Sequence, residues 1–209
     1  KNWTSLAAGL TNEPVHTTRE DPTNENILYA GCFRGVYVSI DRGKSWSYLG
    51  NNMPGTAIAD LEIHESSKDL IAATHGRGIY KINLRPLHSI VNNKFSIDKD
   101  YLFDIPKSRL PWFQSTSRFP DYRTFEKTDI VYWLSDAKPV TLSIKDSVNN
   151  KIWSINLQGQ KGLNQYRWDL IVSRQTSDLP YFTQYEKWLK AGIYTLVLAD
   201  GKSELAQPF

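Results

Sequence analysis

The sequence lacks most of the residues and segments that metal sites, disulfide frameworks and membrane spans require. Cys32 is the only cysteine among 209 residues, which excludes an internal disulfide and a paired-cysteine zinc or redox motif. The histidines stand too far apart to predict a metal-ligand cluster: His16, His64, His75 and His88. No apolar run approaches the roughly 18 residues of a membrane span, and no signal peptide is visible. We therefore expect no metal, no cofactor and no membrane span.

The charge and composition narrow the class of protein further. The net charge of +3 is spread along the chain, without the concentrated Lys/Arg stripe of a nucleic-acid-binding protein. Apolar residues at 40% and charged residues at 22% are ordinary for a soluble globular protein of one or two domains. The seven Trp and eleven Tyr favour β-strands, on whose pleated surfaces their rings pack.

An internal repeat predicts the architecture of the first part of the chain. Shifting the sequence by 43 residues aligns Trp3–Tyr37 with Trp46–Tyr80 without a gap. Identical pairs recur along this alignment: Trp3/Trp46, Leu6/Leu49, Ala30/Ala73, Arg34/Arg77, Gly35/Gly78 and Tyr37/Tyr80. A period of about 40–45 residues built from short apolar runs is typical of one four-stranded blade of a β-propeller. We therefore predict an all-β fold that begins with part of a propeller.

The expected strands follow from alternation and turn residues. The first copy of the repeat should hold four strands, at Pro14–Arg19, Ile27–Ala30, Gly35–Ile40 and Ser45–Leu49. The second copy should hold three, at Ala57–Ile63, Leu70–Ala73 and Gly78–Asn83, with no evident fourth strand. By the same alignment, Asn2–Leu6 is expected to be the fourth strand of an earlier blade.

A turn motif lies between the third and fourth strands of the first copy. Its specified positions are Ser39, Asp41, Gly43, Ser45 and Trp46. Asp41 can accept hydrogen bonds from turn amides, Gly43 permits a positive φ, and Trp46 can pack between sheets. The motif resembles the Asp box (BNR repeat) of sialidases, sortilins and related β-propellers. That resemblance implies that Asp41 stabilises the fold, on the outside of the propeller and away from the ligand face.

Three further segments carry a more specific resemblance: Ile71–Tyr80, Gly162–Leu170 and Ala191–Thr195. The first is similar to the last-blade signature of bacterial secreted proteins described as sortilin-like or glycosyl-hydrolase-like. The other two resemble landmarks of an Ig-like domain, similar to that of the flagellar hook-capping protein, which follows the propeller in that group. Ala191 stands where the group usually has proline. The resemblance implies a secreted, periplasmic or cell-surface protein.

The second half of the chain independently predicts an antiparallel β-sandwich. Short alternating strands are expected at Asp129–Leu134, Val140–Lys145, Lys151–Leu157, Gln165–Leu170, Ile193–Ala199 and Ser203–Gln207, with a short helix at Pro180–Lys190. We thus expect propeller blades over 1–84, a linker and interdomain loop over 85–127, and the sandwich over 128–209, with 101–105 as an alternative first strand.

Strand alternation places the candidate ligand residues at the end of the blades opposite the Asp box. Three loops should meet there: Gly31–Arg34, Asn51–Thr56 and Thr74–Arg77. Arg34 and Arg77 recur at one blade position and could bind a carboxylate or a cluster of sugar hydroxyls, or could instead tie the blades together. His75 breaks the repeat because its counterpart is Cys32.

One residue is a weak catalytic candidate. Asp60 lies on the expected innermost strand with Glu62 two residues later, but no partner carboxylate of a glycosidase can be identified. Aromatic and arginine residues within 107–127 could stack on sugars or cover the seam between domains.

The sequence leaves three functions open. The first is a noncatalytic binding or structural module at the C-terminal end of a secreted or cell-envelope bacterial protein, interacting with carbohydrate or protein. The second is the accessory end of a glycoside hydrolase whose catalytic blades lie outside this chain. The third is sortilin-like peptide binding. In each case the open strand edges should meet further propeller blades or another chain, and this chain alone should hydrolyse no glycoside.

Overall fold

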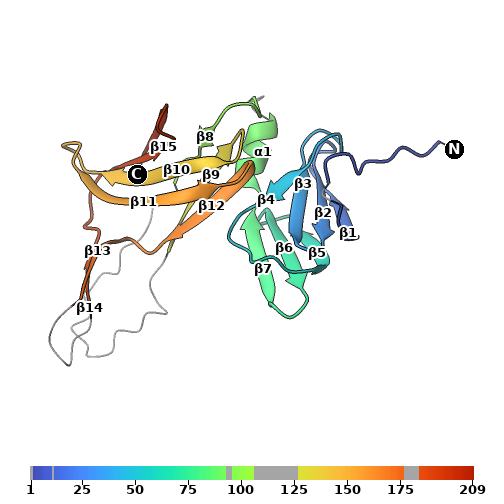
Figure 1. The fold of residues 1–209 in the computed structure, drawn as a ribbon, viewed down its shortest axis with the longest axis horizontal. Helices are drawn as coiled ribbons and strands as arrows, with labels where there is room; N and C mark the ends of the chain where they lie inside the picture. The colour runs from blue at the N-terminus through green and yellow to red at the C-terminus, as the bar shows by residue number, and fades with distance from the viewer. Residues whose placement is uncertain (1, 11, 93–95, 106–126, 177–183) are drawn as a thin grey trace. The chain divides into compact units, whose positions relative to one another are not determined.

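A computed structural model describes residues 2–10, 12–92, 96–105, 127–176 and 184–209, without the side chains of 174–176 and 184–187. In this part of the chain the fold is all-β apart from one short helix (Figure 1). None of the described helical structure is long and apolar enough to cross a membrane. The chain forms two compact units. The first comprises Lys1–Asp100, Tyr132–Lys138 and Gly159–Gln165, and the second comprises Tyr101–Val131, Pro139–Gln158 and Tyr166–Phe209.

The first unit begins with an antiparallel sheet, called the first sheet below. Its strands follow the chain order: β1 (Val15–Glu20), β2 (Leu28–Cys32), β3 (Gly35–Ser39) and β4 (Ser47–Leu49). These are the four strands that the repeat predicts. Beyond β4, the start of β12 (Gly162–Trp168) pairs in parallel, with Gly162 opposite Tyr48 and Leu163 opposite Leu49. The sequence assigned this segment to the sandwich alone, so the pairing was not anticipated.

A second, three-stranded sheet follows in the same unit. It contains β5 (Ile58–His64), β6 (Asp69–Thr74) and β7 (Ile79–Asn83) in that order. Helix α1 (Arg85–Asn92) comes next, inside the segment expected to be a linker. The Asn83 side-chain oxygen accepts a hydrogen bond from the Arg85 amide at 3.1 Å, and Pro86 suits a first helical turn. The helix buries Leu87 and Ile90 on one face.

The two sheets pack through their first strands, β1 and β5. The Thr17 hydroxyl donates to Asp60 Oδ1 at 3.2 Å, and Arg19 Nη2 lies 2.9 Å from the same oxygen. Gly31 of β2 leaves room for Ile58: a Cβ at Gly31 would lie 2.7 Å from Ile58 Cγ2. Thr17 and Asp60 are repeat equivalents, 43 residues apart, so equivalent positions of successive sheets meet.

A buried polar cluster attaches α1 to the first sheet. Asp21, at the end of β1, accepts hydrogen bonds from the Tyr29 hydroxyl at 2.8 Å and from the Thr23 amide and hydroxyl. His88 Nε2 of α1 lies 2.7 Å from Asp21 Oδ2. Burial alone would raise the pKa of Asp21, but the hydrogen bonds from His88, Thr23 and Tyr29 outweigh it and lower that pKa. The carboxylate therefore stays ionised and holds the helix.

The second unit contains most of the strands expected for the sandwich. One sheet has the order β11 (Lys151–Gly159), β10 (Lys138–Lys145), β15 (Thr195–Ala199) and β16 (Glu204–Pro208), and β13 (Ile171–Thr176) pairs with β14 (Gln184–Trp188). Two further strands are β8 (Tyr101–Leu102) and β9 (Thr128–Leu134), of which residues 132–134 belong to the first unit. Asn149 and Gly201 lie in the turns between consecutive expected strands, with φ of 67° and 82°.

Two local predictions are wrong. Residues 2–6 form no strand, because no strand among the described residues pairs with them. The helix predicted at Pro180–Lys190 is replaced by β14 over Gln184–Trp188, whose backbone pairs with β13. Residues 177–183 and the aromatic segment 106–126 lie outside the described residues.

The contact between the sheets makes a testable prediction at Gly31. Replacing Gly31 with Ala should destabilise the chain by about 1–3 kcal/mol, since the new methyl must displace the branched side chains of Ile58 and Thr17. The measurement is urea unfolding. Gly55→Ala is the matched control, because its Cβ would meet only the Arg34 carbonyl oxygen, at 3.9 Å. Equal stability of the two variants would show that the sheets do not approach so closely.

Candidate functional site

The antiparallel strands divide the connections of the first unit between two ends. The turn after β1 and the Asp-box turn after β3 lie at one end, which we call the box end. The β2–β3, β4–β5 and β6–β7 connections lie at the other end. That second end carries the loops Gly31–Arg34, Asn51–Thr56 and Thr74–Arg77, and we call it the loop face. The predicted separation of Asp box and ligand candidates is therefore present in this unit.

At the box end, Asp41 closes its turn as predicted. Its carboxylate accepts hydrogen bonds from the Ser45 amide at 2.8 Å, the Ser45 hydroxyl at 2.6 Å and the Ser39 hydroxyl at 2.8 Å. Ser39 in turn accepts from the Gly43 amide at 2.7 Å, and Gly43 has a φ of 80°. Burial would raise the pKa of Asp41, but the hydrogen bonds from Ser45, Ser39 and the Lys44 amide lower it.

Trp46, the last residue of the box, is less buried than expected. Its ring is half-buried and packs against the cluster of Ala30, Cys32 and Tyr37. Its indole Nε1–H donates a hydrogen bond to the Leu6 carbonyl at 2.8 Å. The rest of the ring is partly exposed. A cavity of about 350 Å³ lies beside it, lined mainly by apolar groups of β1, β2 and the segment from Leu6 to Leu10.

Hydrogen bonds join two of the three loops of the loop face, and the third loop lies close to one of them. The Thr56 hydroxyl donates to the His75 carbonyl at 3.3 Å, and the His75 amide donates to the Ala57 carbonyl at 2.9 Å. A Cβ on Gly55 would lie 3.9 Å from the Arg34 carbonyl oxygen. The β4–β5 connection is therefore bonded to the turn that carries His75 and lies close to the turn that carries Arg34.

Two hydrogen bonds to its backbone hold the turn that carries Arg34. The Glu13 carboxylate accepts a hydrogen bond from the Arg34 amide at 2.9 Å, and the Tyr48 hydroxyl donates to the Arg34 carbonyl. Burial, followed by the neighbouring charges of Tyr37 and Glu13, raises the pKa of Tyr48 to about 12. Burial, with a smaller contribution from Glu13, raises the pKa of the Cys32 thiol to about 11. Tyr48 and Cys32 are therefore neutral supports rather than reactive groups.

The predicted ligand residues stand open on this face. The Arg34 side chain is 75% exposed, and its nearest carboxylate oxygen, of Glu13, is 4.0 Å away. Arg77 is exposed and has no ion pair or side-chain hydrogen bond to the described residues. His75 is also exposed and is held only through its backbone. Both guanidinium groups are thus open to solvent, and each could bind an anionic ligand, Arg34 alongside its ion pair with Glu13.

Sequence reasoning missed the apolar part of the loop face. Phe33 is more than half exposed beside Arg34, and Ile79 is 75% exposed directly after the Arg77 turn. The sequence did contain a signal for the exposure of Phe33, because this aromatic residue stands in the tight turn between two expected strands. Guanidinium groups beside an exposed ring provide both ionic and stacking contacts.

Asp60, the weak catalytic candidate, is engaged in the contact between the sheets. Its side chain is 60% exposed and lies against Thr17 and Arg19. The Leu61 amide hydrogen bond, above all, lowers the pKa of Asp60, with further lowering from Thr17 and Arg19. A general acid needs a raised pKa, so these surroundings favour a permanently charged carboxylate.

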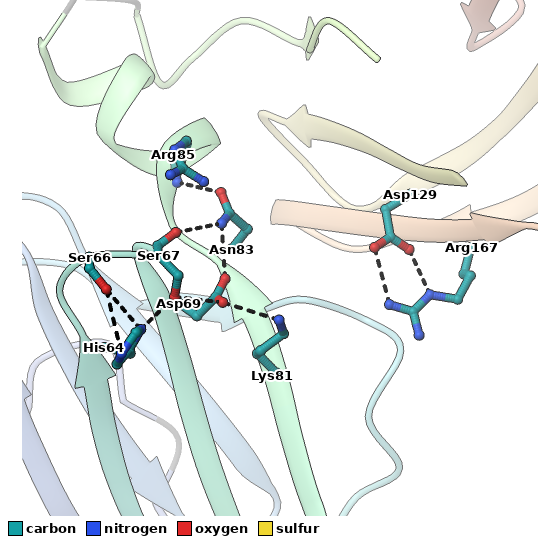
Figure 2. A network of polar contacts seen from close by, with 9 residues as sticks. All are labelled: His64, Ser66, Ser67, Asp69, Lys81, Asn83, Arg85, Asp129 and Arg167. Atoms are coloured by element: carbon teal, nitrogen blue, oxygen red, sulfur yellow. Dashed lines mark hydrogen bonds and ion pairs between the residues drawn. The ribbon is translucent and has the colours of Figure 1, made fainter. Parts of the chain in front are cut away.

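A further polar network surrounds Asp69 at the turn between β5 and β6 (Figure 2). Asp69 accepts hydrogen bonds from Ser67 at 2.8 Å, Asn83 at 2.9 Å and Lys81 at 3.1 Å. The Ser67 hydroxyl also lies 2.8 Å from His64 Nδ1. The hydroxyl therefore stands between carboxylate and imidazole. A catalytic triad requires the imidazole in the middle, so this network is structural.

No group of three or more His, Cys, Asp or Glu side chains in the described residues could hold a metal ion. No family model matches the chain, and comparisons with curated proteins and with solved structures give no significant match.

The box predicts a stability change that leaves the loop face untouched. Asp41→Ala should lower the unfolding free energy by about 1–3 kcal/mol at neutral pH, because several turn donors lose their acceptor. The folded pKa of Asp41 is lowered, so its contribution is present above the unfolded pKa and is lost as pH falls through the folded value. The deficit should therefore shrink in acid.

Thermal or urea unfolding of the wild type and of Asp41→Ala, at neutral pH and in acid, measures the change in unfolding free energy. Asp98→Ala is the control, since the exposed Asp98 uses only its backbone amide in a hydrogen bond. A variant as stable as the control at neutral pH would contradict the assigned role of the box.

Proposed function

We propose that the two sheets of the first unit are adjacent blades of an Asp-box β-propeller. The 43-residue repeat, the antiparallel strand order and the packing of β1 on β5 support this assignment. The box geometry around Asp41 supports it as well, because all five motif residues are present and the carboxylate closes the turn. A closed propeller needs at least about four blades, so in this proposal further blades join these two.

The second unit is, in this proposal, an Ig-like sandwich. Tyr194 lies directly before β15, and its hydroxyl donates to the Lys190 carbonyl four residues upstream at 2.9 Å. Its ring packs against Gly192. This arrangement matches the tyrosine corner of Ig-like domains. Trp168 and Leu170, landmarks of the resemblance, are buried core residues of this unit.

The function that the loop face supports best is noncatalytic binding of an acidic carbohydrate, as part of a secreted or cell-envelope protein. The single observation behind it is the gathering of three loops that carry two open guanidinium groups, of Arg34 and Arg77. A uronate carboxylate can accept paired hydrogen bonds from a guanidinium, and the Phe33 ring can stack on a sugar. An acidic peptide could satisfy the arginines but would not need the ring.

This proposal is tested by titrating the chain with oligogalacturonate and with its methyl ester. Arg34→Ala and Arg77→Ala should each weaken oligogalacturonate binding about 10- to 100-fold, the loss of one charge-assisted hydrogen-bonded pair. Arg85→Ala is the matched control, because Arg85 begins α1 and only its backbone is engaged. Calorimetry measures the affinities.

Three results would contradict the proposal. These are equal binding of the methyl ester, equal binding by the Arg85→Ala and Arg77→Ala variants, and binding of an acidic peptide in preference to every acidic glycan. The last would point to the sortilin-like alternative.

The chain should also release no product from aryl glycosides or polysaccharides. Asp60 is bound by Thr17 and Arg19, and its lowered pKa is the reverse of what an acid catalyst needs. Reducing-sugar assays should give the same baseline for the wild type, for Asp60→Asn and for heat-inactivated protein. Turnover that disappears in Asp60→Asn would make the chain an enzyme.

A further inference from the structure

The loop face carries one arginine on each of the two sheets, at the same position of the repeat. Arg34 lies in the turn after β2, and Arg77 lies in the turn after β6, 43 residues later. Equivalent positions of the two sheets also meet in space, since the Thr17 hydroxyl donates to Asp60, its counterpart 43 residues on. A site that presents the same group twice matches a ligand that also repeats, such as a polymer of identical charged units.

The two arginine turns lie next to successive residues of the β4–β5 connection. A Cβ on Gly55 would lie 3.9 Å from the Arg34 carbonyl oxygen, and Thr56 donates its hydroxyl to the His75 carbonyl at 3.3 Å. Arg77 follows His75 by two residues. Among the described residues no hydrogen bond or ion pair joins one arginine to the turn of the other. The two guanidinium groups therefore start from separate backbone positions.

The Arg34 turn is fixed before any ligand arrives. Cys32 pairs with Gly35, so the turn contains two residues only. Glu13 accepts the Arg34 amide hydrogen bond at 2.9 Å, the Tyr48 hydroxyl donates to the Arg34 carbonyl, and Glu13 Oε1 lies 4.0 Å from Arg34 Nε. A group that is held in place beforehand loses less conformational entropy on binding. Arg34 is thus the better site for a single anionic group.

The Arg77 turn is held at its base and unpacked at its tip. The Gly78 carbonyl accepts hydrogen bonds from the Thr74 amide at 3.1 Å and the Thr74 hydroxyl at 2.6 Å. Gly76 and Gly78 have φ of 79° and 81°, and a Cβ on either would meet no neighbouring atom within 4 Å. Glycine adopts many backbone conformations, so the segment around Arg77 can adjust to a ligand. That adjustment costs conformational entropy, which a ligand already held elsewhere can offset.

We propose that the loop face binds two carboxylates of one acidic polymer, the first at Arg34 and the second at Arg77. This inference rests on the proposed binding of acidic carbohydrate and adds that the ligand is an oligomer with more than one free carboxylate. A guanidinium and a carboxylate form paired hydrogen bonds, so each arginine takes one carboxylate. Once Arg34 holds the first, the second binds intramolecularly, at an effective concentration of about millimolar.

Electrostatics favours one carboxylate for each arginine. Two guanidinium groups gathered on a single carboxylate would repel each other and leave a net positive charge. Two carboxylates of one oligomer neutralise both groups, which remain on their own turns. The loop face should therefore distinguish a polyuronate from a single uronic acid and from a chain whose other carboxylates are esterified.

Calorimetry with two trisaccharides tests the requirement for a second carboxylate. The first is trigalacturonate with all three carboxylates free, and the second is trigalacturonate with two of them methyl-esterified. The two ligands have the same number of rings, so stacking on Phe33 is matched. The wild type should bind the free trimer at least about tenfold more tightly per carboxylate, because avidity adds to the affinity of one contact.

Arginine variants test which group binds first. Arg77→Ala should weaken binding of the free trimer about tenfold or more and leave binding of the esterified trimer within about twofold of the wild type. Arg34→Ala should weaken binding of both. Arg85→Ala is the matched control and should bind both as the wild type does, because only the backbone of Arg85 is engaged. Unchanged circular dichroism spectra would show that all three variants are folded.

The outcomes separate this inference from the proposed function. A wild type that binds neither trimer would overturn both. Equal affinity per carboxylate for the two trimers, or the same loss for both in Arg77→Ala, would overturn the two-carboxylate site and leave the binding of acidic carbohydrate standing. A loss for both trimers in Arg77→Ala, with Arg34→Ala affecting the free trimer alone, would overturn the assignment of Arg34 as the first site.

Discussion

The contact between β1 and β5 is the interaction on which the rest of the first unit depends. Gly31 has no side chain, so Ile58 can approach β2, while Asp60 takes a hydrogen bond from Thr17 and an ion pair from Arg19. This contact joins the two sheets at their first strands. The β2–β3 and β6–β7 turns consequently lie beside the connection that joins the sheets, and their arginines share one face. Exposed ion pairs contribute little by themselves, so the close packing at Gly31 is the stronger constraint.

The two copies of the repeat diverge where the third strand ends, and the cause is local. In the first copy, Ser39 and Asp41 close a turn that returns the chain as β4. In the second copy, Asn83 binds the Arg85 amide, Pro86 follows, and the chain winds into α1. A turn that reverses the chain completes a sheet, whereas a capped helix start leads it away and leaves the β7 edge open.

Sequence alone predicted the strands and the loop face well, because the repeat and the period of two depend on neighbouring residues. It located Arg34, His75 and Arg77 at the end opposite the box by strand alternation. It missed α1 and the pairing of Gly162 with Tyr48, since that pairing joins residues more than a hundred positions apart. It also missed how Glu13 fixes the Arg34 turn, a contact across 21 residues. Pairings of this kind are set by tertiary packing, which local pattern does not report.

The two ends of the first unit differ in how far their charged side chains are engaged by internal hydrogen bonds. At the box end, Asp21, Asp41 and Asp69 each accept several internal hydrogen bonds, and each has a lowered pKa although burial opposes it. These carboxylates are therefore ionised, and their oxygens already accept hydrogen bonds within the chain. At the loop face the guanidinium groups of Arg34 and Arg77 are open to solvent. Exposed positive groups at one end, with these three carboxylates of the other end already hydrogen-bonded, attract anions to the loop face over distances of a Debye length or less, about 8–10 Å. Exposure of the basic end, rather than the small net charge, is thus the physical basis for expecting an acidic ligand.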